Sequence, residues 1–371
     1  MVYILIAAIL IYVGRAAVMF FGSVKERRNA PKGSPENRPF VSVIIPARNE
    51  EEKIEDCIRS FDMVNYPKDK FEIIAVNDRS TDATGDILDR LQKERPHLKV
   101  VHKTKGSDHK NLQGKPGALK EGIDSSRGGY LLMTDADCVV HPEWINSVCD
   151  AFTADESTGL VAAYTLIRGN KSTFDKFQET EWIYMHTMAA AGFALGQPLG
   201  CFGNNLSIKR EAYDKTGGYE NVDFSLTEDL AMLRAVHGKG YRVRYLCSPE
   251  STVTTYPVKN FAEYMSQHRR WAAGGLSLGW RAGLFVLTSI AIYTALILAF
   301  LKGSLFWIFA VLFVRVAGDY AVINPALMEL KKFSLRKWII PSVFFYMFIE
   351  LILPFTMVNK KIKWKGQKFQ G

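Results

Sequence analysis

The feature that most constrains this chain is a run of 20 residues, Ala282–Leu301, that contains no charged side chain. A helix of that length spans the ~30 Å hydrocarbon layer of a bilayer, so the run predicts a membrane-crossing helix. Met1–Phe21 is a second apolar segment, and its only charge is Arg15. It lacks the basic start and small-residue cleavage site of a secretory signal. We therefore expect an uncleaved transmembrane helix over residues 1–22.

Two further apolar segments follow near the C-terminus, so residues 282–358 are expected to form about three transmembrane or partly interfacial helices. Gly303–Met328 contains Arg315 and Asp319, which stand four residues apart on one helical face. We expect these two side chains to pair inside a helical bundle. Trp338–Val358 contains a glutamate and two prolines, so it either kinks or lies partly in the membrane interface.

The charge of the chain lies almost entirely at its two ends. The sequence holds 47 lysines and arginines against 38 acidic residues, and the whole net charge of +9 comes from residues 1–22 and 282–371. Residues 23–281 are electrically balanced. A domain without a basic excess is not expected to bind nucleic acid.

The basic flanks of the apolar segments predict an orientation in the membrane. They place residues 23–281 in the cytoplasm, against anionic membrane lipids, as in a multi-pass protein of a bacterial inner membrane. Four crossings would put the basic tail, residues 359–371, on the other side. Either this tail departs from the positive-inside rule or one apolar segment does not cross.

The balanced middle of the chain alternates strand and helix patterns after a linker rich in Pro, Gly and Asn, residues 23–39. The predicted strands are Phe40–Ile45, Phe71–Val76, Lys99–His102 and Tyr130–Met133, and the predicted helices between them include Glu50–Phe61 and Asp82–Leu91. This alternation predicts an α/β domain over residues 40–258 with a mostly parallel sheet. No G-x-G-x-x-G or G-x-x-x-x-G-K-[ST] follows a strand, which disfavours a dinucleotide-binding domain and a P-loop enzyme.

Acidic residues follow two of these strands, at the sheet edge where ligands gather. Asp135 and Asp137 stand at i and i+2 after a buried strand, and such a pair can hold one hard cation together with a diphosphate. The alternative is a turn or helix-cap pair. Asp78 could accept hydrogen bonds from a base or ribose, or it could cap the next helix in competition with Asp82.

Two more motifs lie nearer the membrane segments. Glu228 and Asp229 precede an amphipathic run, where they either begin a helix or present a carboxylate to an acceptor hydroxyl as a general base. The sequence QHRRW, residues 267–271, lies in a helical stretch over residues 259–281. A basic and aromatic segment beside a membrane helix is commonly an interfacial anchor, which is the alternative to a role in a site.

Taken in order, these motifs resemble the D, D-x-D, E-D and Q-x-x-R-W series of the family 2 inverting glycosyltransferases with a GT-A fold. The resemblance is to the membrane-integral branch, which includes cellulose, hyaluronan and chitin-oligosaccharide synthases and ceramide glucosyltransferases. It runs from about Val41 to Trp271. Residues 46–50, 114–119 and 203–205 are similar to the family's P-x-x-N-E, G-K-x-G-A-L and G-x-N motifs.

The resemblance implies a role for each motif residue. The residues expected to bind the nucleotide sugar are Arg48, Glu50, Asp78, Lys115 and Asp135. Asp137 would ligate Mg²⁺ or Mn²⁺ at the diphosphate, and Asp229 would be the base that deprotonates the acceptor for a single displacement. The residues expected on the acceptor and diphosphate side are Glu228, Gln267, Arg270 and Trp271.

The resemblance also implies a nucleotide-sugar donor, expected to be a UDP-sugar, and a lipid or short glycan acceptor. A processive β-polysaccharide synthase is the alternative, and with so few helices it would need a membrane partner subunit. A catalytically silent scaffold or export component is a third hypothesis, against which the intact acidic series argues. The apolar face of Thr173–Leu195 predicts packing, or otherwise an acceptor entry lined by aromatic and Met side chains.

Overall fold

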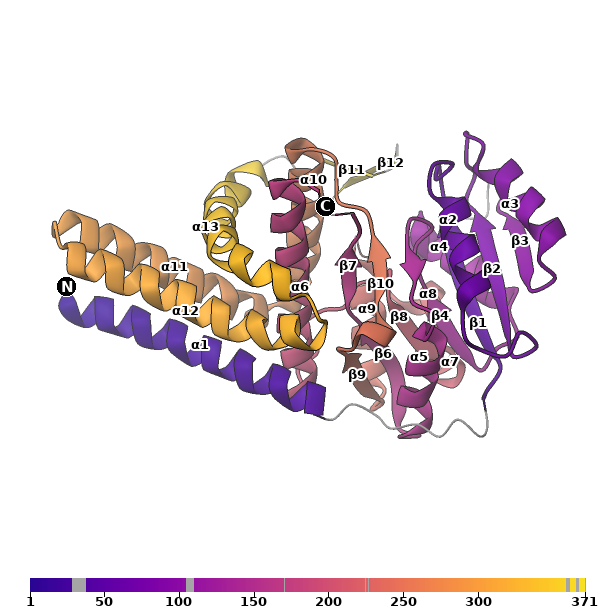
Figure 1. The fold of residues 1–371 in the computed structure, drawn as a ribbon, viewed down its shortest axis with the longest axis horizontal. Helices are drawn as coiled ribbons and strands as arrows, with labels where there is room; N and C mark the ends of the chain where they lie inside the picture. The colour runs from indigo at the N-terminus through magenta and orange to yellow at the C-terminus, as the bar shows by residue number, and fades with distance from the viewer. Residues whose placement is uncertain are drawn as a thin grey trace.

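The computed structural model describes residues 1–28, 38–104, 110–169, 171–223, 225, 227–357, 361–364 and 367–370. An α/β body lies at one end of the molecule, and long helices project from it at the other end (Figure 1). Most of the predicted linker, residues 29–37, lies outside the described residues, and so do five positions of the predicted tail, residues 359–360, 365–366 and 371.

The α/β body is built on a seven-stranded sheet with the order β3-β2-β1-β4-β8-β6-β9. Its strands are β1 (Val41–Ala47), β2 (Phe71–Asn77), β3 (Leu98–His102), β4 (Tyr130–Met133), β6 (Thr158–Ala163), β8 (Leu206–Lys209) and β9 (Arg242–Leu246). Only β8 runs antiparallel to its neighbours within this sheet. The predicted α/β fold with a mostly parallel sheet is confirmed, and each of the four predicted strands is found.

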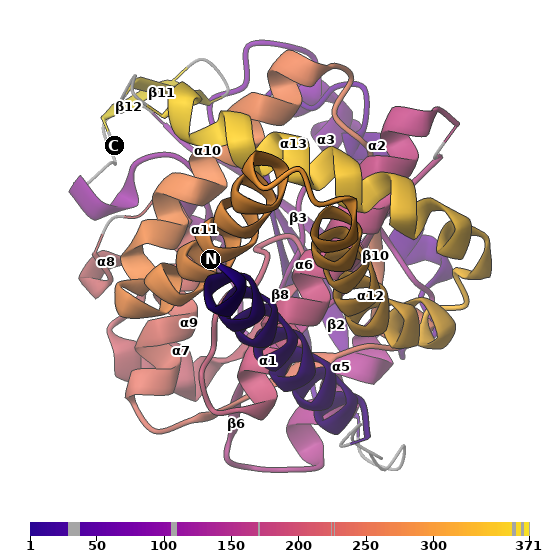
Figure 2. The ribbon, with the colours of Figure 1, turned by 90° about the vertical axis from the view of Figure 1, so that its left-hand side faces the viewer.

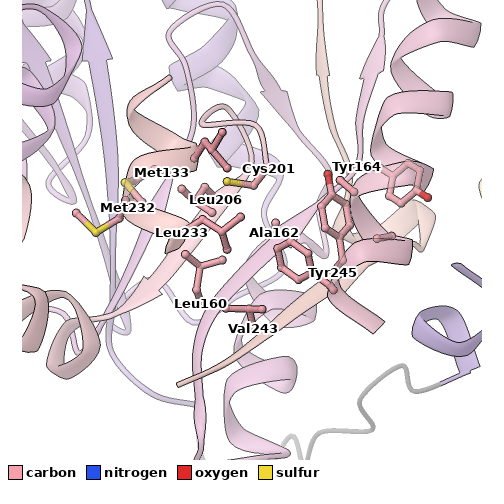
Figure 3. Packing of buried hydrophobic residues seen from close by; sticks show 14 of the residues in the cluster. Met133, Leu160, Ala162, Tyr164, Cys201, Leu206, Met232, Leu233, Val243 and Tyr245 are labelled. Carbon is pink, nitrogen blue, oxygen red and sulfur yellow. The ribbon is translucent and has the colours of Figure 1, made fainter. Parts of the chain in front are cut away.

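Helices cover both faces of the sheet because alternate residues of its strands enter two separate cores. Ile44 and Ile74 belong to one cluster of buried side chains, whereas Val43 and Ile73 belong to the other. The covering helices are α2 (Ile54–Ser60), α3 (Thr84–Glu94), α4 (Lys115–Asp124), α5 (Trp144–Thr153), α6 (Thr173–Ala194), α7 (Arg210–Thr216), α8 (Gly218–Asn221) and α9 (Glu228–Gly238). Figure 3 shows Met232 and Leu233 of α9 packed against strand residues of the first cluster, which fixes α9 on the sheet.

Two predicted helices begin later than expected. The helix expected from Glu50 begins at Ile54, and the one expected from Asp82 begins at Thr84. The preceding residues bond to each other across the two loops instead of continuing the helices. Glu51 N donates to Asp82 Oδ2 at 3.1 Å, and Ala83 N donates to Glu51 Oε2 at 2.9 Å.

A smaller sheet with the order β5-β10-β7 stands beside the main one. Its strands are β5 (Val139–Val140), β7 (Thr165–Ile167) and β10 (Val253–Thr255), and a separate hairpin is formed by β11 (Lys361–Trp364) and β12 (Gln367–Gln370). The helix α10 (Phe261–Gly275) follows β10 and contains the QHRRW motif. The small sheet therefore connects the end of the α/β body to the helix that precedes the apolar segments.

Four helical segments of the described chain are long and apolar enough to cross a membrane. They are α1 (Val2–Arg28), α11 (Trp280–Leu301), α12 (Leu305–Glu329) and α13 (Ile339–Thr356) together with the short 3-10 helix Phe333–Trp338 before it. The helix that contains the predicted transmembrane segment, residues 1–22, is longer than that segment, because α1 continues to Arg28 along the α/β body. There Glu26 Oε1 accepts a hydrogen bond from Tyr245 N of β9 at 2.9 Å.

The four apolar helices do not share one direction. In Figure 1 α1, α11 and α12 run along the long axis of the molecule, whereas α13 is seen nearly end-on. Figure 2 shows α13 lying across the ends of the other helices. Ile349 of α13 packs with Tyr264 and Met265 of α10, so α13 is held against the helix that carries QHRRW.

Charged side chains pair where these helices meet the body. Arg315 Nε lies 2.9 Å from Asp319 Oδ2, which confirms the expected pairing. Arg315 NH2 also donates to Glu350 Oε1 of α13 at 2.8 Å, and Tyr184 Oη of α6 donates to Asp319 Oδ1 at 3.0 Å. A buried charge is tolerated only when it is paired, so this network ties α6, α12 and α13 together.

Candidate active site

One cavity of about 820 Å³ lies between the loops after β1, β2 and β4, the start of α9, and α10. Strand register brings the loops to the same edge: Ala47 pairs with Asn77, and Ile44 pairs with Met133. All eleven predicted site residues lie on the wall of this cavity. They are Arg48, Glu50, Asp78, Lys115, Asp135, Asp137, Glu228, Asp229, Gln267, Arg270 and Trp271.

The loop after β2 presents Asp78, whose buried carboxylate is held by two arginines. Arg79 Nε donates to Asp78 Oδ1 at 2.8 Å, and Arg48 NH1 lies 3.6 Å from Asp78 Oδ2. The helix-cap alternative for Asp78 is wrong, because Asp82 Oδ1 accepts the backbone N–H of Thr84 at the start of α3. Asp78 and Arg48 together form a charged and hydrogen-bonding edge of the cavity.

The D-x-D pair follows β4 and faces the cavity. The side chains of Asp135 and Asp137 are 33% and 27% exposed, and each approaches a lysine: Lys115 Nζ lies 2.6 Å from Asp135 Oδ1, and Lys53 Nζ lies 3.8 Å from Asp137 Oδ2. Among the described residues no backbone N–H donates to either carboxylate, so these carboxylates do not act as turn or helix caps.

The donor set at the D-x-D pair fits one kind of metal site. Within the described part of the chain, no group of three or more His, Cys, Asp or Glu side chains could hold a metal by itself. Mg²⁺ is usually bound through one or two carboxylates together with substrate phosphates and waters. Asp137, with Asp135 beside it, therefore fits a divalent cation that is completed by a diphosphate.

Asp229 has the surroundings of a general base. Its Oδ2 accepts from Gly203 N and its Oδ1 accepts from Leu230 N, both at 2.7 Å. Burial and the neighbouring Glu228 raise the pKa of Asp229 to about 6, although Lys115 and the two backbone N–H groups act against the shift. A base works best when its pKa lies near the operating pH. Asp229 thus lies in the first turn of α9, and its environment also suits the role of a general base, which stays a prediction.

Lys115 connects the two acidic motifs. Its Nζ lies 2.6 Å from Asp135 Oδ1 and 3.2 Å from Glu228 Oε1. Burial lowers the pKa of Lys115, but the carboxylates of Asp135 and Glu228 raise it more strongly, so the ammonium stays charged. The Lys115 ammonium group therefore joins the loop after β4 to the first turn of α9 and offsets part of their negative charge.

The helix α10 is docked on α6 by the buried pair of His268 and Glu181. His268 Nε2 lies 2.9 Å from Glu181 Oε1 of α6, and Tyr264 Oη donates to Glu181 Oε2 at 2.7 Å. Burial lowers the pKa of His268, but the Glu181 carboxylate raises it more strongly. This docking leaves Gln267 and Arg270 on the cavity wall, so QHRRW is part of the site and not merely an interfacial anchor.

On the side of the cavity formed by α10, Arg270 and Trp271 differ in how they contact other residues. Arg270 forms no ion pair with any residue that the structure describes, although the cavity is rich in carboxylates. Trp271 meets Trp182 edge-on with ring centres 5.6 Å apart, and Phe202 stacks on Trp182 at 5.3 Å. Trp182, Phe202 and Trp271 form what we call the aromatic wall.

Sequence reasoning missed several residues on the cavity wall. The missed basic residues are Lys53, Arg168, Lys171 and Lys259. Arg168 directly follows β7, so strand-end reasoning would have found it if that three-residue strand had been predicted. The backbone N–H of Gly203, which donates to the expected base, has no side chain to mark its role.

The fold and the site together define a class of enzyme. A mostly parallel sheet whose edge carries a D-x-D pair, facing a helix that begins with a buried acidic pair, is the arrangement of a GT-A glycosyltransferase. Comparison with known proteins then gives the family. The family model for glycosyl transferase family 21 matches residues 3–370, and the chain belongs to that family.

Individual relatives agree with this class. The chain is 31% identical over 251 residues to the probable glycosyltransferase YdaM of Bacillus subtilis (strain 168), covering 67% of this chain and 58% of that protein. It is 29% identical over 243 residues to the beta-monoglucosyldiacylglycerol synthase of Nostoc sp. (strain PCC 7120), covering 64% and 49%. The chain thus spans about half the length of the curated relatives it matches.

A solved structure shows the same fold. The mannosyltransferase PcManGT from Pyrobaculum calidifontis, solved in complex with GDP-Man and Mn²⁺, superposes with a TM-score of 0.62 at 19% identity. The superposition covers 94% of this chain and 99% of that one. The GT-A architecture expected from the motifs is thereby confirmed.

Proposed function

We propose that this enzyme is an inverting glycosyltransferase that moves a sugar from a nucleoside-diphosphate sugar to a hydroxyl group of a membrane lipid. The observation that carries the proposal is the position of Asp229. A buried carboxylate with a pKa of about 6 shares one cavity with a D-x-D pair, and Lys115 stands between them. This arrangement suits a base that acts on an acceptor while the donor's diphosphate is held nearby.

The donor would lie along the strand-end loops. Arg48, Glu50 and Asp78 would bind the nucleoside, and Lys115 and Asp135 would contact the diphosphate or sugar. A UDP-sugar is the donor that the motif resemblance implies. Mg²⁺ or Mn²⁺, bound by Asp137 and the donor's phosphates, would neutralise charge that develops on the diphosphate.

The residues near α10 would act on the departing group. Arg270 has no carboxylate partner among the described residues, so its guanidinium is available to diphosphate oxygens. A hydrogen-bond donor that is already positioned where negative charge develops stabilises the transition state without reorganisation. Gln267 and Trp271 would close the same side of the cavity.

Transfer would proceed in a single displacement. Asp229 takes the proton of the acceptor hydroxyl while the hydroxyl oxygen forms a bond to the anomeric carbon. The bond from that carbon to the diphosphate breaks, and the nucleoside diphosphate leaves with the bonding electrons. A single base suffices for this step, whereas double displacement needs a second carboxylate as nucleophile. Because the anomeric carbon is attacked only once, its configuration inverts.

Two observations favour a lipid acceptor over a growing polymer. Trp182 of α6 and Trp271 of α10 line the cavity, and Figure 1 shows α6 and α10 between the α/β body and the projecting apolar helices. A relative of similar sequence is named for the synthesis of a glucosyl lipid, beta-monoglucosyldiacylglycerol. A processive β-polysaccharide synthase, working with a membrane partner subunit, is the alternative that the experiment below distinguishes.

The same proposal includes a place in the membrane. With α1, α11 and α12 crossing and α13 lying along the cytoplasmic interface, the α/β body and the basic tail are on the same side. This arrangement of three crossings obeys the positive-inside rule at every basic cluster, which four crossings would not. A reporter fused after Gly371 should be active only in the cytoplasm, and a periplasmic signal would contradict this topology.

Membranes containing the enzyme, incubated with labelled UDP-glucose, UDP-galactose, UDP-N-acetylglucosamine and GDP-mannose, test the proposed reaction. We expect label from a UDP-sugar in a lipid extract, in a product with one or a few sugars, and its loss when EDTA is added. High-molecular-mass product would support the polymer alternative. Absence of label from lipid with all four donors would reject the lipid acceptor.

A further inference from the structure

A second cavity, of about 340 Å³, lies between the α/β body and the apolar helices. Helices α1, α6, α11 and α13 contribute to its wall together with the loop before β8. The lining residues are Arg15, Tyr184, Met185, Met188, Ala189, Leu199, Gly200, Cys201, Phe202, Phe285, Ser289 and Glu350. We call it the junction cavity, and its volume is within the range of ligand pockets.

The junction cavity shares one residue with the active-site cavity. Phe202 lines both, so its ring belongs to the wall between them. The next residue, Gly203, donates its backbone N–H to Asp229 Oδ2 at 2.7 Å. A group that passes Phe202 from the junction cavity therefore arrives beside the expected base.

The wall of the junction cavity has an apolar part and a polar part. Met185, Met188 and Phe285 are apolar and adaptable in shape, which suits hydrocarbon chains. Arg15 donates to Thr288 Oγ1 at 3.3 Å and to Tyr184 Oη. These polar groups can hydrogen-bond a head group at a depth where bulk water is scarce.

Glu350 is a charged group on the wall of the junction cavity that a bound head group could contact. Its carboxylate pairs with Arg315, yet its side chain remains 32% exposed in the described structure, and it lines the cavity. Tyr293 Oη also donates to Glu350 Oε2 at 2.9 Å, so the carboxylate is held in place while its exposed edge can accept a further hydrogen bond from a head group. Arg15 and Glu350 carry opposite charges, so the lining is balanced and does not favour an anionic head group.

The location also suits a lipid. Ser289 lies in the first half of α11, roughly 13 Å along the helix axis from Trp280 at its start. The cavity is therefore at the level where the apolar helices leave the α/β body. Figure 2 looks onto this end of the molecule, with α1, α11 and α12 in front of α6 and α13 lying across them.

We propose that the junction cavity binds the acceptor lipid itself, a neutral lipid with a free hydroxyl group, and that the lipid reaches Asp229 by displacing Phe202. The upper part of its chains lies against Met185, Met188 and Phe285, and its head group contacts Arg15 and Glu350. This inference rests on the lipid acceptor proposed above and adds the site and the head-group charge.

The variant Ser289→Trp tests the inference by filling the junction cavity, and Leu287→Trp is its matched control. Leu287 lies on the same helix, is 51% exposed, and is not part of the cavity wall. Leu199→Trp fills the cavity from the loop before β8 and serves as a second variant. Each protein is assayed with a labelled UDP-sugar and either long-chain diacylglycerol in neutral vesicles or a short-chain, water-soluble diacylglycerol. UDP binding and Tm show whether each variant is folded.

We expect Ser289→Trp to lower transfer to the long-chain lipid about tenfold or more, which corresponds to about 1.4 kcal/mol. Transfer to the short-chain acceptor should change less than twofold, because it can enter through the active-site cavity. Leu287→Trp should match the wild type with both acceptors.

Several outcomes would overturn the inference. Equal long-chain transfer by Leu287→Trp and both filled variants would show that the cavity is not used. Equal losses with both acceptors would place the effect in catalysis, and a wild-type preference for polyprenyl phosphate would contradict the neutral head group. If the wild type transfers sugar to no lipid, the proposed function fails as well. If Ser289→Trp and Leu199→Trp are folded and transfer sugar to lipid normally, only the proposal for the junction cavity is rejected.

Discussion

The half of the cavity proposed to bind the donor, called the donor half, and the half proposed to receive the acceptor, called the acceptor half, are built in different ways. The donor half consists of short loops after β1, β2 and β4, which leave adjacent parallel strands in register. The acceptor half consists of the start of α9, the helix α10 and the aromatic wall. Its members come from distant parts of the chain and meet only through helix packing.

The two halves also differ in how their charges are satisfied. On the donor side Asp78 already lies between Arg48 and Arg79. On the acceptor side Asp229 has a raised pKa, and Arg270 has no ion-pair partner within the described residues. The charges of the proposed donor side are therefore already paired by the loops of the sheet, whereas the proposed acceptor side keeps a carboxylate with a raised pKa and an arginine without an ion-pair partner among the described residues. Substitutions on the two sides should therefore separate donor binding from transfer.

The largest expected effect is that of Asp229→Asn, which removes the proposed base. Transfer should fall about 10³-fold, because a general base contributes on the order of 10²–10⁴-fold to a rate. UDP binding by calorimetry should stay within twofold. Tm should change little, because removal of a buried charge offsets the loss of one of the two backbone hydrogen bonds that the carboxylate accepts. Asp223→Asn, the same change at an exposed position of the preceding loop, is the control. Full transfer by Asp229→Asn would remove this residue from the chemistry.

Asp137→Asn should affect both halves, and its effect should be the next largest. Loss of the proposed metal ligand is expected to lower transfer about a hundredfold, since a metal supplies several kcal/mol of charge stabilisation. Mn²⁺-dependent UDP binding should weaken in parallel, which distinguishes this variant from Asp229→Asn. Asp69→Asn on the surface provides the comparison. Unchanged sensitivity to EDTA and unchanged UDP binding would contradict the assignment.

Gly274→Ala tests the packing of the acceptor half alone. A Cβ at Gly274 would lie 2.3 Å from Thr227, so α10 would have to move away from the turn that carries Asp229. A displacement near 1 Å costs up to ~10²-fold, and we expect about a tenfold loss of kcat with UDP binding unchanged. Gly275→Ala is the matched control, because nothing lies within 4 Å of its Cβ. Equal activity of the two variants would show that this contact does not position the site.

The pH dependence of kcat should be the smallest effect. Transfer needs ionised Asp229, and burial raises the pKa of this carboxyl to about 6, so activity falls as pH falls through 6. Between pH 7 and pH 5.5 the ionised fraction drops about fourfold. Glu228→Gln removes a charge that raises the pKa of Asp229 and should move this limb of the profile to lower pH. If the acid limb of the pH profile does not shift in Glu228→Gln, a group other than Asp229 causes that limb.

Much of the donor half was predictable from the sequence. Asp78 directly follows β2 and the D-x-D pair comes one residue after β4, both of which are mainly apolar, and parallel strand ends meet at one edge. The crossed loops before α2 and α3 were not predictable. Glu51 and Asp82 have local patterns of helix starts, but Asp82 Oδ2 accepts from Glu51 N and Glu51 Oε2 accepts from Ala83 N, each across the two loops.

The acceptor half was predictable only as a set of motifs. QHRRW and Glu228-Asp229 are visible in the chain, but the contact of Gly274 with Thr227 and the pair of His268 with Glu181 are not. These contacts depend on how helices far apart in sequence pack against one another. Residue spacing within one segment carries no information about them.

The sequence by itself determined the alternation of strands and helices, the apolar segments and the order of the acidic motifs. Each of these is written in contiguous residues, because hydrophobic periodicity and turn chemistry act locally. Only the tertiary structure decided that α13 lies across its neighbours and that Phe202 lines two cavities. Helix directions and shared walls follow from packing among distant side chains, and that packing is settled only when the whole chain is folded.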